Sequence, residues 1–104
     1  MKKHSLIIKI LGARGSAPVS GTDYRVFGGA TSSVRVIAEG DGRILQEELY
    51  LDAGSGIISA VPEKNSSIAI FFSHLHLDHI QGLPVFRALS ERGRNIDIYA
   101  LRGR

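Results

Sequence analysis

The sequence predicts a single α/β domain, a mixed sheet with flanking helices. Apolar runs of strand length recur along the chain, and the stretches between them carry helical spacing or helix-stop residues. No repeat, low-complexity tract or Pro/Ser-rich linker divides the 104 residues. The expected order is strand, hairpin, short helix, strand, helix, strand, so residues 1–104 are interpreted as one domain.

The first half of the chain is expected to form a strand, a long loop and a hairpin. Residues 6–11 are a near-continuous apolar run, which is typical of a strand covered on both faces. Residues 12–29 are rich in Gly, Ser and Pro without a period, which indicates an irregular loop. The alternation over 34–39, the Asp-Gly pair at 41–42 and the apolar run over 44–51 predict a hairpin.

The second half is expected to contain two helices and two strands. "LDAGSGI" ends the hairpin at Asp52 and opens a short helical stretch over 57–61. Residues 68–72 and 96–101 read as strands, and apolar residues at helical spacing over 83–89 predict a helix between them. The aromatic side chains expected in the core are Phe71, Phe72 and Phe86.

Composition restricts the class of protein and the kind of metal site. With 43% hydrophobic and 22% charged residues and no apolar run near the roughly 18–20 residues that cross a bilayer, a cytoplasmic protein without a membrane partner is expected. No small-residue cleavage site follows "MKKHSLIIKIL", which therefore reads as a first strand. Cysteine is absent, so any metal must be bound by nitrogen and oxygen atoms.

The strongest signal is "FFSHLHLDHIQGLP", residues 71–84, directly behind an apolar strand. Residues two apart in an extended segment point the same way, so His74 and His76 can bind one ion, while Asp78 and His79 aim at a second position. Imidazole and carboxylate suit zinc, manganese or iron(II), and two such ions about 3.5–4 Å apart activate a water for hydrolysis. Clustered histidines also occur in tags, pH-sensing surfaces and cores, but this cluster is internal and interleaved with leucines.

At these residues the chain resembles the metallo-β-lactamase fold hydrolases, especially their ribonuclease Z-like and phosphodiesterase-like branch. The likeness is carried by His-x-His-x-Asp-His followed by "IQGLP". "LGARGSAPV", "FGGATSSV", "LDAGSGI" and "IDIYA" follow the order that the family shows, so the likeness covers nearly the whole chain. It implies the N-terminal half of an αββα sandwich.

The resemblance implies two divalent ions, most simply zinc, with manganese or iron as alternatives. Asp52 matches an aspartate that supports the metal-binding loop by hydrogen bonds, and Ser73 is expected beside it. From the residues alone, Asp52 at a strand end is equally a helix N-cap. The implied metal ligands are His74 and His76 for the first ion and Asp78 and His79 for the second, with Asp78 also the catalytic residue.

Two further motifs have open interpretations. The glycines of "GARGSAP" allow backbone N–H groups to approach a phosphate, but a tight connection is the simpler interpretation. "GGATSS" has Ala30 and Ser33 where many members of the family carry asparagine and often cysteine, which leaves side-chain roles at these positions open.

The family takes further ligands from its C-terminal half: a histidine, a bridging aspartate and another histidine. After His79 this sequence has no histidine, and its acids are Glu91 and Asp97. We therefore expect a truncated domain with an uncovered apolar sheet face, and either self-association or a C-terminal half as its partner.

The expected function is that of a metal-dependent hydrolase. It would cleave phosphodiester bonds of RNA, nucleotides or other small molecules through a metal-activated hydroxide. The alternative is a metal-binding fragment without catalysis, and a third option is a basic nucleic-acid-binding module, since the net charge is +3. No residue is assigned to substrate binding.

Overall fold

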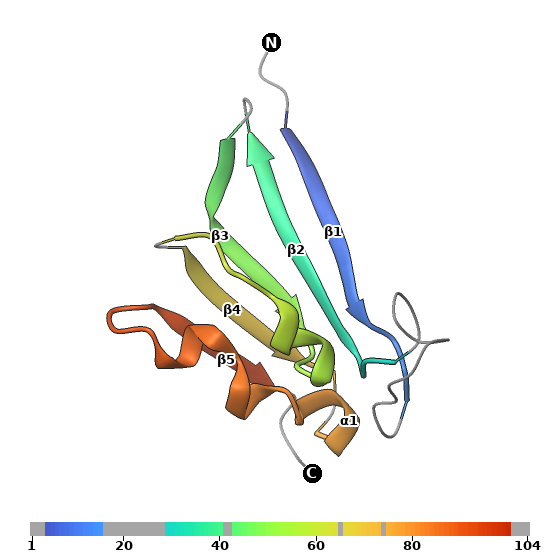
Figure 1. Cartoon of the computed structure of the whole chain (residues 1–104). Helices are drawn as coiled ribbons and strands as arrows, with labels where there is room; N and C mark the ends of the chain where they lie inside the picture. The colour runs from blue at the N-terminus through green and yellow to red at the C-terminus, as the bar shows by residue number, and fades with distance from the viewer. Residues whose placement is uncertain (1–3, 16–28, 41–42, 65, 74, 101–104) are drawn as a thin grey trace.

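Five strands form one mixed sheet in the computed structural model, in the order β1-β2-β3-β4-β5 (Figure 1). The structure describes residues 4–15, 29–40, 43–64, 66–73 and 75–100. The antiparallel part contains β1 (His4–Gly12), β2 (Ser33–Gly40) and β3 (Arg43–Leu51). The parallel part joins β3 to β4 (Ser67–Phe72) and β5 (Ile96–Ala100). The predicted α/β class with a mixed sheet is confirmed.

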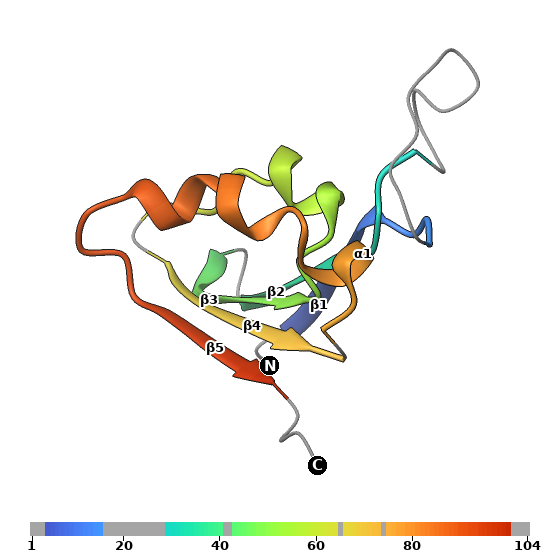
Figure 2. The same cartoon turned by 90° about the horizontal axis from the view of Figure 1, so that it is seen from below.

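The connections between the parallel strands are short helical turns on one face of the sheet (Figure 2). Successive crossovers of one hand that step in one direction place both connections on the same side. The 3-10 helix η2 (Ser55–Ser59) joins β3 to β4. The segments between β4 and β5 are α1 (Leu77–Ile80), η3 (Leu83–Val85) and η4 (Arg87–Ser90).

Among the described residues, no element covers the opposite face, which we call the open face. It carries the even-numbered side chains 6–10 of β1 and 34–38 of β2, and the odd-numbered side chains of β3, β4 and β5 from residue 47 onward. The prediction that residues 6–11 are covered on both faces is therefore wrong. Leu6, Ile8 and Ile10 of the edge strand β1 are 67%, 63% and 72% exposed.

The first helical prediction is confirmed with a shift of two residues, and the second is wrong in its continuity. The stretch expected over 57–61 is a 3-10 helix over Ser55–Ser59. The helix expected over 83–89 is broken into η3 and η4, and α1 is a separate turn before it. Pro84 lacks a backbone N–H, and Phe86 is extended with φ −67° and ψ 122°, so the ladder of helical hydrogen bonds stops twice.

The predicted strands over 44–51 and 68–72 are confirmed as β3 and β4. The pairing of β2 with β3 confirms the hairpin. The strand expected over 96–101 is β5, which ends at Ala100. The Asp-Gly turn at 41–42, most of the 12–29 loop and residue 101 lie outside the described residues.

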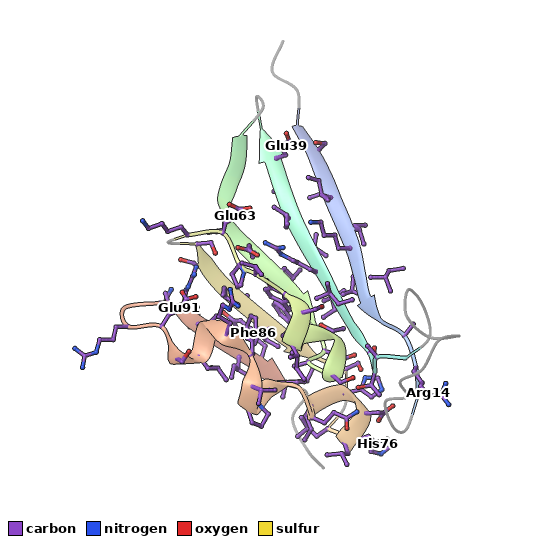
Figure 3. All side chains as sticks on the ribbon, viewed as in Figure 1. Arg14, Glu39, Glu63, His76, Phe86 and Glu91 are labelled. Atoms are coloured by element: carbon purple, nitrogen blue, oxygen red, sulfur yellow. The ribbon has the colours of Figure 1, made fainter. Side chains whose placement is uncertain are left out.

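The core lies between the sheet and the helical turns. Phe86, labelled in Figure 3, lies in this core, and its ring meets that of Tyr50 edge to face with ring centroids 5.1 Å apart. Phe72 and Phe86 are buried as predicted, whereas Phe71 points to the open face and is 43% exposed. The buried cluster consists of Tyr50, Ala53, Ile57, Ala60, Ile68, Ile70, Phe72, Phe86 and Ala88.

A buried carboxylate, Glu48, fastens the segment before β4 to the sheet. Its Oε1 accepts a hydrogen bond from Arg35 Nε at 2.7 Å, and its Oε2 accepts from Glu63 N and Ser66 Oγ, both at 2.6 Å. Burial by itself raises the pKa of Glu48, but the hydrogen bonds from Ser66, Glu63 and Arg35 outweigh it and hold the pKa below its ordinary value of 4.5.

This network predicts how stability depends on pH. Because folding lowers the pKa of Glu48, its stabilisation is present above the unfolded value near 4.5 and is lost as the pH falls through the folded pKa. The free energy of unfolding in urea should therefore decrease as the pH falls below about 4.5. In Glu48→Gln this decrease should be smaller, and stability at neutral pH should be lower by about 3 kcal/mol because Arg35 loses its buried partner.

The control is Glu39→Gln, which removes a carboxylate from a half-buried position at the end of β2. It should change stability at neutral pH by no more than about 0.5 kcal/mol. An acid-induced loss of the same size in Glu48→Gln and in the unmodified chain would contradict the role given to Glu48.

Candidate functional site

The polar side chains of the predicted site meet where β3 and β4 end and α1 begins. Parallel strands end at the same edge of a sheet, which brings Asp52 after β3 close to Ser73 after β4. α1 follows β4 directly and contributes Asp78 and His79. In Figure 3, His76 lies at this end of the molecule, beside α1.

Asp52 connects the three segments of the site. Its Oδ1 accepts a hydrogen bond from Ser73 N at 2.8 Å, and its Oδ2 accepts from Ser73 Oγ at 2.8 Å and lies 2.9 Å from His79 Nδ1. Its backbone has φ 63°, in the left-handed region that aspartate tolerates better than most residues. Asp52 does not cap η2, because the N-cap there is Gly54 and makes no side-chain capping bond.

The environment of Asp52 favours its ionised form. Burial alone raises the pKa of its carboxyl, but hydrogen bonds from the Ser73 backbone, His79 and the Ser73 hydroxyl outweigh burial, so the pKa lies below its ordinary value. An ionised carboxylate only accepts hydrogen bonds, so Nδ1 of His79 must carry the proton of their contact. Asp52 thereby sets both the tautomer and the orientation of the His79 ring.

The other nitrogen of His79 faces a second acceptor. Nε2 lies 3.3 Å from Asp78 Oδ2. In the neutral ring with the proton on Nδ1, Nε2 is an acceptor, and so is the Asp78 carboxylate, so a proton or a cation is needed between them. Two ligands about 2.0–2.2 Å from a tetrahedral ion lie about 3.4 Å apart, so the spacing of this pair fits one shared metal ion.

The ligands predicted for the first ion are described only in part. His76 is the N-cap of α1, its side chain is exposed, and its carbonyl accepts from His79 N at 2.9 Å. His74 lies outside the described residues, so the predicted pairing of His74 with His76 stays a prediction. Within the described part of the chain, no group of three or more His, Asp or Glu side chains is close enough to hold a metal ion.

Close backbone contact holds α1 against the end of β3. Ala53 N donates to His79 O at 2.7 Å, and Gly82 N donates to Ala53 O at 2.8 Å. A methyl group on Gly54 would overlap the carbonyl oxygen of Asp78, and one on Gly82 would overlap that of Gly54. Both positions therefore require glycine if Asp78 and His79 are to stay where they are.

A second group of hydrogen bonds, centred on Thr31, is not foreseen from the sequence. Thr31 is fully buried and exchanges hydrogen bonds with Ser55 through Thr31 N to Ser55 Oγ at 2.9 Å and Ser55 N to Thr31 Oγ1 at 2.7 Å. Gln81, just after α1, donates from Nε2 to Thr31 Oγ1 at 2.6 Å. The motifs "GGATSS" and "IQGLP" contain Thr31 and Gln81, but a polar residue in a loop gives no sign of its partner 50 positions away.

The structure describes part of each of the two motifs that the sequence left open. Ser33 is buried, and its hydroxyl donates to Asp52 O at 2.9 Å, so it supports the bend at Asp52. Ala30 contributes its carbonyl, which accepts from Ala13 N at 3.1 Å and Arg14 N at 2.9 Å. These two N–H groups of "GARGSAP" form hydrogen bonds within the protein. This favours the interpretation of the motif as a tight connection and not as a phosphate-binding loop.

Comparison of the chain with protein-family models, with curated proteins and with solved structures finds no match. No helix among the described residues is long and apolar enough to cross a membrane. The molecule is an α/β domain with an Asp-Ser-His hydrogen-bond group and a facing aspartate at the carboxyl ends of two parallel strands.

The glycine contacts predict a large effect of one added methyl group. Gly54→Ala should lower the free energy of unfolding by about 2–3 kcal/mol, because the methyl group meets backbone atoms that cannot move without displacing α1. Gly15→Ala is the matched control, because a methyl group there meets nothing within 4 Å. Urea unfolding followed by circular dichroism measures both. Equal stability of the two variants would contradict the contact between α1 and the end of β3.

Proposed function

We propose that this chain supplies metal ligands to a hydrolase of the metallo-β-lactamase fold, in the ribonuclease Z-like and phosphodiesterase-like branch. One observation carries the proposal. His79 Nε2 and Asp78 Oδ2 lie 3.3 Å apart, while Asp52 occupies the other nitrogen of the His79 ring. A histidine held by a carboxylate on one nitrogen, with a second ligand side chain beside the other, is the usual arrangement of a metal-binding imidazole.

Asp78 and His79 hold one divalent ion, and His74 with His76 holds the other. Zinc suits these nitrogen and oxygen donors best, with manganese or iron as alternatives. When bound, such ions polarise a phosphoryl oxygen and lower the pKa of a water molecule.

The residues of the chain prepare this chemistry in three ways. Asp52 and Ser73 hold His79 in one orientation, and the Asp52 carboxylate makes the ring a stronger donor to a metal. Asp78, the catalytic residue in this proposal, accepts a proton from the attacking water. The contacts of Gly54 and Gly82 keep α1 from shifting when charge at the site changes.

The substrate class of the proposal is the phosphodiester of RNA or a nucleotide. It is supported by the resemblance of "HIQGLP" to that branch of the family and by the moderate excess of basic residues, 13 Lys and Arg against 10 Asp and Glu. Ala13 N and Arg14 N already donate to the carbonyl of Ala30. The glycine loop "GARGSAP" therefore adds no support for a phosphate-containing substrate.

A second candidate function is metal binding without turnover. It is favoured by the small number of metal ligands that the described residues bring together. The described residues bring together two donors, Asp78 and His79, whereas a catalytic zinc usually has three protein ligands and a water. Metal content and turnover, measured on the same protein, separate the two functions.

Metal affinity tests the role of Asp52 in the proposal. Asp52→Asn keeps the shape of the side chain but replaces one acceptor oxygen with a donor, so His79 loses its fixed tautomer. Zinc affinity measured by isothermal titration calorimetry should fall by about 10–100-fold. Asp97→Asn, at an exposed position on β5, should bind zinc like the unmodified chain. Unchanged affinity in Asp52→Asn would rule out its supporting role.

Turnover of bis-p-nitrophenyl phosphate tests the reaction. With zinc, manganese or iron(II) present, the full-length parent of this chain should release nitrophenolate, and Asp78→Asn in it should lower the rate at least about 100-fold, whereas the 104-residue chain alone is expected to be inactive. Asp97→Asn again serves as the control. Bound metal without turnover would favour the second function, and cleavage of thioesters or lactams in place of phosphodiesters would reject the substrate class. RNA binding that persists without metal and after replacement of His76 and Asp78 by alanine would reject both functions.

A further inference from the structure

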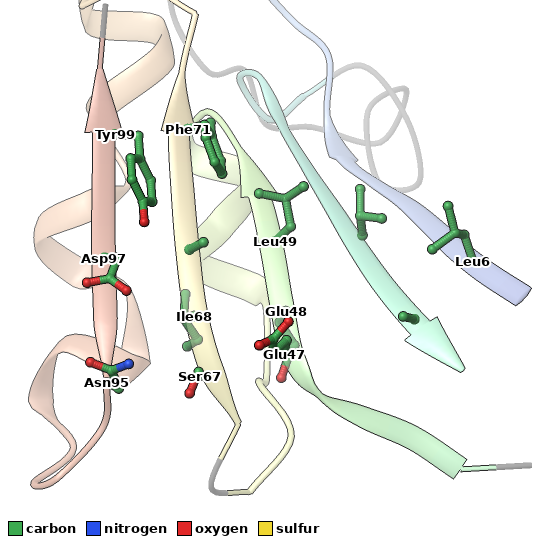
Figure 4. Close-up of a pocket in the computed structure, with 13 residues that line it drawn as sticks. Leu6, Glu47, Glu48, Leu49, Ser67, Ile68, Phe71, Asn95, Asp97 and Tyr99 are labelled. Carbon is green, nitrogen blue, oxygen red and sulfur yellow. The ribbon is translucent and has the colours of Figure 1, made fainter. Parts of the chain in front are cut away.

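The open face of the sheet is apolar over most of its area. Figure 4 shows its centre, where Leu49 of β3 and Phe71 of β4 project on the same side as Tyr99 of β5. Phe71 and Tyr99 stack with ring centroids 4.6 Å apart and remain 43% and 49% exposed. With the exposed leucine and isoleucines of β1, they form a continuous apolar surface across the sheet.

Charged groups lie at one end of this surface. Among the described side chains of the open face, the acids are Glu47 and Asp97, close to the starts of β4 and β5 in the paired register. The opposite end carries Leu51, Phe71 and Tyr99. The shallow hollow between the strands also has a mostly apolar lining.

The size of the surface is what a modest dimer requires. Strands lie about 4.8 Å apart and residues about 3.3 Å along each, so five strands of about six or seven residues present roughly 500 Å². Exposed apolar patches on monomers reach about 300–600 Å², so this face lies near the upper end. Two such faces packed together cover about 1,000 Å², the lower limit for a specific interface and below the roughly 1,200–2,000 Å² of stable ones, so the dimer is expected to be weak.

We infer that two copies of this chain pack open face to open face as a two-layer β-sandwich dimer. Twisted sheets of the same hand fit each other at about 10 Å with their strands about 30° apart, and a second copy provides a sheet of the same twist. Leu49 on the central strand would contact its own counterpart at the two-fold axis. With the strands of the two copies antiparallel, the acids of each copy stay at opposite rims and avoid each other.

The inference does not depend on the proposed function, because the described metal ligands His76, Asp78 and His79 belong to α1 and its N-cap and not to the strands of the open face. Sedimentation velocity over micromolar to submillimolar concentrations, with EDTA present throughout, therefore tests it separately. The unmodified chain should show a monomer-dimer equilibrium. Phe71→Glu and Leu6→Glu each place a charge in the interface and should weaken the dimer at least about tenfold.

Ile58→Glu is the matched control. Ile58 is 50% exposed on η2, on the covered side of the sheet, so this variant adds the same charge away from the open face and should dimerise like the unmodified chain. Leu6 lies on the edge strand, so Leu6→Glu should keep its fold even if Phe71→Glu does not, and circular dichroism checks both.

Three results would overturn the inference. The first is an unmodified chain that stays monomeric at every concentration. The second is a dimer that Ile58→Glu disrupts while Leu6→Glu leaves it intact. The third is a monomer whose open-face amides become protected from hydrogen exchange only when another polypeptide is added, which would assign the face to a different occupant.

Discussion

The hydrogen bonds of the Asp52 carboxylate hold the other residues of the site in place. The carboxylate receives hydrogen bonds from the backbone and side chain of Ser73 and from His79, and so joins the ends of β3 and β4 to α1. Without an ionised acceptor at this point, the Ser73 N–H would lose its partner and the His79 ring would lose its orientation. The left-handed backbone of Asp52 is a local cost that these three contacts and the Ser33 hydroxyl offset.

The backbone around Asp52 leaves little freedom to the segment that carries Asp78 and His79. The contacts of Gly54 and Gly82 bring α1 against the end of β3, and Thr31 connects both to the start of β2 through Ser55 and Gln81. A helix of four residues has few hydrogen bonds of its own, so its position depends on these neighbours. The position of α1 thus depends on hydrogen bonds shared between several loops and not on the support of a long helix.

The same topology that builds the site also produces the open face. Crossovers of one hand between β3, β4 and β5 place all of the helical turns on one side. That side buries Tyr50, Ile70 and Phe86, and the other exposes Leu6, Ile8 and Ile10. A near-continuous apolar run such as residues 6–11 predicts a strand, but it does not show which face of the strand has a neighbour.

Apolar periodicity and turn residues are local signals, and they were enough to predict the strands, the α/β class and the position of the histidine-aspartate cluster directly after β4. Only the tertiary structure decided that Asp52 contacts His79 instead of capping η2, that Gln81 reaches Thr31, and that Phe71 lies on the surface. Each of these depends on segments that are 20 or more residues apart. Contacts of that range are set by how strands pair and on which side the connections cross, and no local pattern of residues specifies either.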